Sequence, residues 1–260
     1  MLIDAHAHVG SCRVFGHNLE PATVLAMMDA HGVTTSIVQP FPGAPDPARV
    51  HDLIAELGRQ HPGRIYGIAS LSPHQDAEAY RTEVRRCVQD LGFVGLKIHP
   101  IGHAVNPLTP DARLPFEVAT ELNVPVMIHT GPGIPFAEPA MWIPLARAFP
   151  QTTVILAHAG WGLFTGPAIL AGELCENVVL ETSWCNVTDL ARMAKVVGAD
   201  RMLFGADMPL NVPVEVAKYQ ALGMSDTDLE QVLWRNSERL FRLTGLPQPA
   251  ASTNEAPAHL

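Results

Sequence analysis

The chain has 260 residues, of which 47% are hydrophobic, and its formal net charge is −9 at pH 7. This length suits one α/β domain with a sizeable core, and the acidic balance without a basic run argues against nucleic acid or an anionic membrane as partner. The sequence predicts neither a signal peptide nor an apolar run of the roughly 20 residues that cross a bilayer. The four cysteines lack C-x-x-C spacing, which favours free thiols in a reducing cytoplasm.

Short β-branched or apolar runs recur at intervals of about 24 to 33 residues, close to the length of a βα unit. Eight such runs are predicted strands: Leu2–Val9, Val33–Gln39, Ile65–Leu71, Phe93–His99, Val126–His129, Val154–His158, Val178–Thr182 and Met202–Asp207. Apolar residues at helical spacing fill the segments between and after them: Glu20–His31, Pro47–Gln60, Ala77–Leu91, Leu114–Leu122, Pro139–Phe149, Pro167–Leu174, Val187–Val197, Val212–Leu222 and Asp226–Leu243.

Eight strands that alternate with helices predict a parallel sheet closed into a (β/α)8 TIM barrel, a single domain over residues 1–246. A doubly wound open sheet is the main alternative, but no G-x-G-x-x-G or P-loop motif supports it. Residues 247–260 are rich in Ala and Pro and are expected to form a disordered tail.

Metal-competent side chains gather at the carboxyl ends of the predicted strands, where the catalytic residues of such barrels lie. They are His6, His8, Lys97, His99, His129, His158 and Asp207. Residues i and i+2 of a strand share a face, so His6 and His8 together form half of a divalent-metal site. An H-x-H pair alone arises easily among twelve histidines, but scattered surface histidines would not share this registry.

Several motifs resemble the amidohydrolase superfamily: IDAHAH, GLKIHP, VPVMIHTG, VILAHAG, NVVLETS, and ADRMLFGADMP followed by a helix ending in RLFRL. The chain is most similar to the amidohydrolase-related (amidohydrolase 2) branch of TIM-barrel metal-dependent hydrolases. That branch also includes decarboxylases related to aminocarboxymuconate-semialdehyde decarboxylase. The resemblance reaches to about Leu243, and it specifies the family and fold much more closely than the substrate.

The resemblance implies a metal centre and assigns roles to its residues. His6, His8 and His129 are the implied nitrogen ligands, and Asp207 is the implied carboxylate ligand and catalytic proton acceptor. His158 is implied as a ligand of a second metal in two-metal members. In one-metal members the same histidine is a catalytic group that polarises the substrate or shuttles a proton.

Lys97 falls where two-metal relatives carry a carboxylated lysine that bridges the ions, although many one-metal relatives keep the lysine without the bridge. We therefore favour one metal over two. Zinc suits a nitrogen-rich ligand set, while manganese and iron fit the same ligand types. Such an ion lowers the pKa of bound water toward about 7. The main expectation is a hydrolase that uses metal-activated water to open an amide, lactone or ester bond of a small carbonyl substrate.

Two other functions stay open at this point. A lyase on the same scaffold, either a non-oxidative decarboxylase or a hydratase of a small aromatic-derived acid, would use the same ligands. A decarboxylase would need a cation for the substrate carboxylate, and Arg13 is the only basic residue in the first loop apart from histidine. A non-catalytic binding barrel is disfavoured because no ligand position is missing. A homodimer is implied only by the resemblance.

His99, Trp161 and Trp184 follow strand ends and are candidates for substrate contacts, with packing under loops as the alternative. His103 is expected to be an exposed loop histidine. Four further histidines have no partner pattern and are expected to be solvated: His17, His51, His74 and His259.

Asp4 is expected to share the face of His6 because it lies two residues earlier, and it is kept outside the site because a structural hydrogen bond explains it equally well. Cys12 and Cys185 are expected to pack as small apolar residues rather than to act as nucleophiles.

Overall fold

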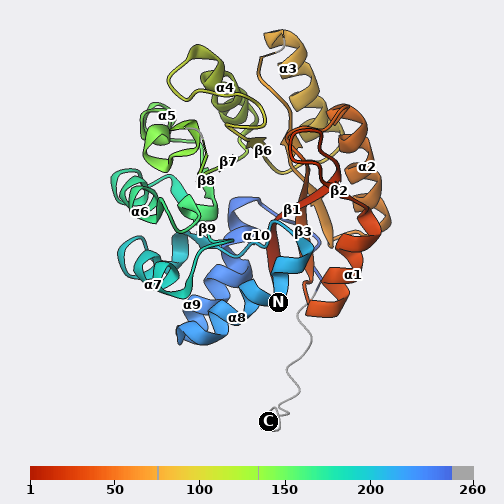
Figure 1. Cartoon of the computed structure of the whole chain (residues 1–260). Coiled ribbons are helices and arrows are strands. Elements are labelled where there is room, and N and C mark those ends of the chain that lie inside the picture. The colour runs from red at the N-terminus through yellow and green to blue at the C-terminus, as the bar shows by residue number, and fades with distance from the viewer. Residues whose placement is uncertain (75, 134, 248–260) are drawn as a thin grey trace.

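In the computed structural model, which describes residues 1–74, 76–133 and 135–247, helices form a ring around central strands (Figure 1). The strands in the described residues are β1 (Ile3–Ser11), β2 (Asn18–Leu19), β3 (Thr35–Pro40), β4 (Ile65–Gly67), β5 (Ala69–Ser70), β6 (Leu96–Ile98), β7 (Val126–His129), β8 (Val154–Ala157), β9 (Val178–Glu181) and β10 (Met202–Leu203). The α-helices in the same residues are α1 (Pro21–His31), α2 (Pro47–Gln60), α3 (Ala77–Arg85), α4 (Arg113–Leu122), α5 (Ile143–Ala148), α6 (Thr165–Leu174), α7 (Val187–Val196), α8 (Val212–Leu222), α9 (Asp226–Glu230) and α10 (Asn236–Leu240). The predicted single-domain (β/α)8 fold is confirmed.

The barrel consists of two hydrogen-bonded sheets joined at two seams. One sheet has the order β2-β1-β3-β4 and the other β10-β9-β8-β7-β6-β5, and all pairs except β1 with β2 are parallel. β4 and β5 are two halves of one predicted strand, interrupted at Ile68. At the other seam, Ala5 N–H donates to the Phe204 carbonyl and Asp207 N–H donates to the His6 carbonyl, at 3.1 and 2.7 Å. The last predicted strand therefore pairs with β9 only as far as Leu203, and its following residues bond to β1 and close the barrel.

The interior of the barrel has an apolar lower half, at the amino ends of the strands, and a polar upper half, at their carboxyl ends. Side chains from the successive barrel strands fill the lower half: Ile3, Ala5, Ile37, Ile68, Met127, Ile155, Val179 and Leu203. Burial of each of the larger side chains in this set stabilises the fold by about 1.5–3 kcal/mol. Because alternate residues share a face, the next inward residues after Ile37, Met127 and Val179 are Gln39, His129 and Glu181. The alternation thus sets polar groups directly above an apolar base.

A β-bulge in β1 brings the two histidines onto the inner face. Asp4 pairs with Ser36 of β3, but Ala7 pairs with Val38, so β1 has one extra residue between these pairs. Before the bulge the odd-numbered Ile3 packs inside the barrel, whereas after it the odd-numbered Ala7 packs in the outer core. The even-numbered histidines therefore face inward.

The expectation that Asp4 shares a face with His6 is wrong for the same reason. Asp4 Oδ1 instead accepts hydrogen bonds from the backbone N–H groups of His6 (3.0 Å) and Ala206 (2.9 Å). Its carboxyl is buried, and burial raises its pKa to about 8 against the lowering effect of these two hydrogen bonds. Asp4 is thus a structural link between the first and last strands.

Two predicted helices are broken by wide turns. The predicted helix Ala77–Leu91 ends as α3 at Arg85 and continues as a π-helical turn over Arg86–Asp90, closed by a bond from Leu91 N–H to the Arg86 carbonyl at 3.0 Å. The closing segment Asp226–Leu243 likewise divides into α9, a π-helical turn and α10. Among the described residues, no helix has the length and apolar character needed to cross a membrane. The predicted tail, beyond residue 247, lies outside the described residues.

Candidate metal centre

A cavity of about 500 Å³ opens above the polar half of the barrel. Nine residues singled out from the sequence line it: His6, His8, Lys97, His99, His129, His158, Trp161, Trp184 and Asp207. The strands' carboxyl ends and the loops that follow them therefore bring the predicted ligands and the predicted substrate contacts to one place.

Three of the predicted ligands converge closely at the floor of this cavity. His6 Nε2 and His8 Nε2 lie 3.2 Å apart, and Asp207 Oδ1 lies 3.5 and 3.2 Å from them, respectively. Ligand atoms bound at about 2.0–2.2 Å from one ion are separated by about 3–3.5 Å. The spacing of these three atoms fits a single divalent ion.

The protonation of both histidines also suits a cation. His8 Nδ1 lies 3.3 Å from the Pro40 carbonyl and His6 Nδ1 lies 2.9 Å from Glu181 Oε2, so each Nδ1 must carry the proton and donate it. Burial lowers the pKa of both imidazoles, that of His6 far below its ordinary value, which keeps both rings neutral. The two Nε2 lone pairs therefore face the same point as Asp207 Oδ1. Neutral imidazoles and a carboxylate form a suitable ligand set for a divalent transition metal.

Asp207 is ionised in this setting. Burial on its own raises the pKa of the carboxyl, but any positive charge shared among His6, His8 and His158 outweighs burial and lowers it well below its ordinary value. Asp207 has φ +66°, in the left-handed region, and its backbone N–H is held by the His6 carbonyl. The backbone thus fixes the carboxylate beside the two imidazoles.

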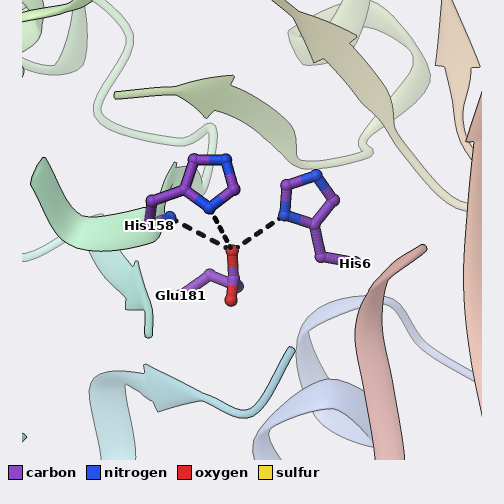
Figure 2. A group of neighbouring side chains, drawn as sticks. All are labelled: His6, His158 and Glu181. Atoms are coloured by element: carbon purple, nitrogen blue, oxygen red, sulfur yellow. Dashed lines mark hydrogen bonds and ion pairs between the residues drawn. The ribbon is translucent and has the colours of Figure 1, made fainter. Parts of the chain in front are cut away.

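Glu181 is the functional residue that the sequence reasoning missed. Its Oε2 accepts from His6 Nδ1 (2.9 Å), from the His158 backbone N–H (3.1 Å) and from the Ser183 hydroxyl (3.0 Å), while Oε1 accepts from Ser183 N–H at 2.7 Å. Figure 2 shows this fully buried carboxylate between His6 and His158. The available signal was a carboxylate two residues after Val179 in the predicted strand, on the face that turns inward.

His158 has the same tautomer as the two ligand candidates. Its Nδ1 lies 2.7 Å from Ser183 Oγ, and because that hydroxyl donates to Glu181, it accepts the Nδ1 proton of His158. Burial lowers the pKa of His158 to about 3, so the ring is neutral and its Nε2 carries a lone pair. His6, His158 and Glu181 form a second group whose ligand atoms lie within 4.8 Å of one another.

Lys97 lies beside the first group. Its Nζ donates to His6 Nε2 at 2.9 Å, and its side chain is buried. Burial lowers the pKa of this amine to about 8, although Asp207 and Glu181 partly oppose the shift. Carboxylation of Lys97 stays a prediction.

His129 lines the cavity but belongs to none of the three tight groups found among the described residues. Its ring stacks on that of His99 with 3.9 Å between centroids and meets the ring of His158 edge-on at 4.8 Å. Its role as the third nitrogen ligand therefore stays a prediction.

His99 differs from His6, His8 and His158 in the ring nitrogen that carries its proton. Its Nδ1 accepts from Gly102 N–H at 3.1 Å, so the neutral ring carries its proton on Nε2 and is a donor. The expectation that His103 is exposed is wrong, because it is buried and its Nδ1 accepts the His99 backbone N–H at 3.2 Å. The turn between these residues thus fixes the tautomer of His99.

The expectation that His51 is solvated is also wrong. This histidine lies on the buried face of α2. Its Nδ1 lies 2.8 Å from Glu83 Oε1, and its Nε2 accepts Ser70 N–H at 3.0 Å. His17 and His74 are exposed as expected, and His259 lies outside the described residues. All four cysteines are free and buried, and burial raises the pKa of Cys185 to about 12.

Aromatic and apolar side chains wall the cavity above this floor. The indoles of Trp161 and Trp184 stack with centroids 5.2 Å apart and an interplanar angle of 11°. Phe41 stacks on His8 at 4.5 Å and 8°, and the largely exposed Leu210 lies at the rim. The cavity therefore combines a polar floor with flat apolar walls.

Comparison with known proteins agrees with this arrangement. The family model described as amidohydrolase matches residues 3–243. The chain belongs to the amidohydrolase family. This amidohydrolase-family chain is 28% identical, over an alignment 286 positions long including gaps, to gamma-resorcylate decarboxylase of Rhizobium radiobacter. The alignment covers 86% of this chain and 87% of that protein.

A second relative and one solved structure of similar fold extend the comparison of this amidohydrolase-family enzyme. It is 28% identical over 237 residues to 2-keto-4-carboxy-3-hexenedioate hydratase of Sphingobium sp. (strain NBRC 103272 / SYK-6), covering 74% of this chain and 70% of that protein. The crystal structure of dihydroxybenzoic acid decarboxylase from Polaromonas sp. JS666 contains bound manganese and the inhibitor 2-nitroresorcinol. The two folds match with a TM-score of 0.74 and 21% identity over 93% of this chain and 96% of that one.

Proposed function

We propose that this protein is a metal-dependent lyase that decarboxylates a small planar aromatic acid without an oxidant. The observation that carries the proposal is the cavity itself. Two unprotonated imidazole nitrogens, from His6 and His8, and the Asp207 carboxylate meet at its floor, and stacked indoles form its wall. Such a slot accepts a flat ring with its acid group directed to a cation.

The named relatives support a lyase over the hydrolase that the sequence first favours, because they are decarboxylases and a hydratase. The manganese in the related decarboxylase structure supports Mn²⁺ as the first metal to test, ahead of zinc. The cation that a decarboxylase needs for its substrate is also present, since Lys97 lines the cavity floor. The Arg13 considered from the sequence is not required.

Each cavity residue has a distinct part in this proposal. His6, His8, Asp207 and, as a third nitrogen ligand, His129 would hold the metal, which when bound neutralises the substrate's oxygens and stabilises the negative charge that develops on them. His99, the donor tautomer, directs its Nε2–H to a carboxylate or hydroxyl oxygen of the substrate. The indoles contact the faces of the ring, where aromatic stacking is worth about 0.5–1.5 kcal/mol beyond burial.

The reaction exchanges carbon dioxide for a proton. The bond between the ring carbon and the carboxylate breaks, the carboxylate leaves as CO2, and the ring carbon gains one proton that is taken ultimately from water. Asp207 and His158 lie close enough to the floor to pass that proton, His158 through its unprotonated Nε2. Positioned proton transfer of this kind contributes about 10²–10⁴-fold to a rate.

The test is a substrate panel on protein stripped of metal and reloaded with Mn²⁺. The panel contains gamma-resorcylate, 4-hydroxybenzoate as an acid without an adjacent hydroxyl, a lactone and a cyclic amide. We expect CO2 release from gamma-resorcylate or a close analogue, loss of activity with chelator, and recovery with Mn²⁺. Ring opening of the lactone or amide without CO2 release would overturn the lyase in favour of the hydrolase.

The role of His99 has its own test. His99→Ala removes an imidazole that carries its proton on Nε2, and we expect a roughly tenfold rise in KM with a smaller change in kcat, because a hydrogen bond to a charged oxygen is worth about 1.5–3 kcal/mol. His17→Ala, which changes an exposed histidine at the cavity mouth, is the control. An unchanged KM in the His99 variant would contradict the assignment.

A further inference from the structure

Trp184 is bonded to the candidate ligand Asp207. Its indole Nε1–H donates to Asp207 Oδ2 at 2.8 Å. The other oxygen of that carboxylate, Oδ1, is the atom that lies 3.2 Å from His8 Nε2 and 3.5 Å from His6 Nε2. The two oxygens of Asp207 therefore have separate partners, one facing the ligand imidazoles and one held by the indole.

The chain holds Trp184 in place from behind. Trp184 has φ +65°, in the left-handed region that costs a bulky residue about 1 kcal/mol or more, so its surroundings must fix it. Its backbone N–H donates to Glu215 Oε1 at 2.8 Å, and the same oxygen accepts from Asn211 Nδ2 at 2.8 Å. Glu215 is fully buried on α8 and forms an ion pair with Lys218 at 2.5 Å. The indole is thus part of a fixed network and not a mobile wall.

We propose that Trp184 is a positioning residue that makes Asp207 a one-oxygen ligand of the metal. A carboxylate can bind a cation through one or both oxygens. A hydrogen bond to an ionised acceptor is about twice as strong as one between neutral groups, so the indole holds Oδ2 and leaves Oδ1 alone for the ion. A coordination position that a second oxygen would occupy is left to the substrate. This inference rests on the metal site of the proposed function.

The stacked indole pair supplies a matched control. Trp184→Phe and Trp161→Phe both replace one indole of the pair with a smaller aromatic ring, but only the first removes a donor to Asp207. We expect Mn²⁺ affinity, measured by calorimetry on metal-free protein, to fall about tenfold in W184F, the lower end for loss of a partner that orients a metal ligand. Affinity in W161F should stay within about twofold of the wild type. In turnover, W184F should lower kcat and W161F should mainly raise KM.

A measurement on the wild-type chain avoids any effect of a substitution on folding. The chain has four tryptophans, so ¹⁵N-labelled protein gives at most four indole N–H signals, and the two variants assign those of Trp161 and Trp184. During titration with diamagnetic Zn²⁺, the Trp184 signal should keep the downfield shift of a proton bonded to a carboxylate. Movement of that signal to the position of a free indole would overturn the proposal.

The outcomes separate this inference from the proposed function. If wild-type protein binds neither Mn²⁺ nor Zn²⁺, the metal site itself is refuted. If the wild type binds metal and W184F binds it as tightly as W161F does, the site stands and the positioning role of Trp184 is refuted.

Discussion

Two clusters of His and carboxylate side chains in this chain have similar compositions and opposite hydrogen bonding. The inner cluster is His6, His8 and Asp207 at the cavity floor, and the outer cluster is His51, Glu83 and Cys87 between α2 and α3. In each, the ligand atoms lie within 4.8 Å of one another. Composition and spacing alone therefore mark both as candidate metal sites.

The partners of the outer cluster explain why we assign it a structural role. His51 Nδ1 donates to Glu83 and its Nε2 accepts Ser70 N–H, so neither nitrogen has a lone pair to offer. The Arg86 guanidinium donates to both Glu83 oxygens at 2.8 Å, which already neutralises the carboxylate.

In the inner cluster the protons lie on the far side of each ring and the Nε2 lone pairs converge. Their present donors, Lys97 Nζ for His6 and Gln39 Nε2 for His8, are side chains that an ion can displace, unlike the backbone N–H that His51 accepts. The tautomer is the same in both, but His51 points its Nδ1–H at the carboxylate of its own cluster, whereas His6 and His8 point theirs away. The orientation of the rings, set by their partners, and not the residue types, distinguishes the two clusters.

The largest expected effect comes from exchanging a carboxylate for an amide in each cluster. Asp207→Asn should lower kcat by about 10³-fold, since it weakens the metal site and removes a proton-transfer group, while the melting temperature changes little. Glu83→Gln is the matched variant and should leave kcat within about twofold while lowering stability. Turnover and thermal unfolding of both proteins check this, and a near-normal rate in D207N would remove Asp207 from the mechanism.

The second largest expected difference between the two clusters is in metal affinity. His8→Ala removes a proposed ligand and should weaken Mn²⁺ affinity by at least about 100-fold, more than the loss of a residue that only orients a ligand. His51→Ala should leave the number of bound ions and their affinity unchanged. Calorimetry together with metal analysis of dialysed protein measures both. Loss of bound metal in H51A would show that the outer cluster binds an ion after all.

Glu181→Gln tests whether the proton positions matter as the comparison implies. In the Gln variant one of the two carboxylate oxygens becomes an NH2 group, which donates instead of accepting. It would face either His6 Nδ1–H or the N–H and O–H of Ser183, so the tautomer of His6 is no longer enforced. We expect Mn²⁺ affinity to fall about 10–100-fold although Glu181 itself is not a proposed ligand of the first site. An unchanged affinity, with normal folding, would reduce Glu181 to a packing role.

Much of this centre could be predicted from the sequence because strand periodicity acts locally. The eightfold rhythm of apolar runs predicts the barrel, and the barrel places residues at strand ends together, as the shared cavity of His6, His129, His158 and Asp207 bears out. The resemblance to the amidohydrolase family, confirmed by the match over residues 3–243, supplied the proposed roles.

The sequence-based predictions failed where contacts between distant segments determine the position of a side chain. The bulge in β1 depends on the register with β3, so the i, i+2 rule failed between Asp4 and His6. Burial of His51 depends on Glu83, 32 residues away, and on Ser70. Glu181 lies 175 residues from the His6 ring that it fixes, and no local pattern joins them. Hydrogen-bond partners, and thus tautomers, are properties of the folded chain.

The smallest expected effect is a pH-dependent one in the outer cluster. Burial alone raises the pKa of Glu83, but the hydrogen bonds from His51 and Arg86, together with the charge of Arg86, outweigh burial and lower it to about 2, against an ordinary value of 4.5. A depressed pKa in the folded state stabilises the fold above the ordinary value, and this stability is lost as the pH falls from about 4.5 through about 2. Because the cluster is partly exposed to solvent, screening limits the effect to about 1–2 kcal/mol.

Urea unfolding of metal-free wild-type and E83Q protein at pH 7, 4 and 3 measures this contribution. The Gln variant should be less stable by about 1–2 kcal/mol at pH 7, and the difference should shrink steadily below pH 4.5 as the wild-type carboxylate takes up its proton. Asp111→Asn, which changes an exposed carboxylate paired with His74, is the control and should show a smaller difference at every pH. A constant difference for E83Q from pH 7 to 3 would mean that packing of the side chain, and not its charge beside His51 and Arg86, stabilises the outer cluster.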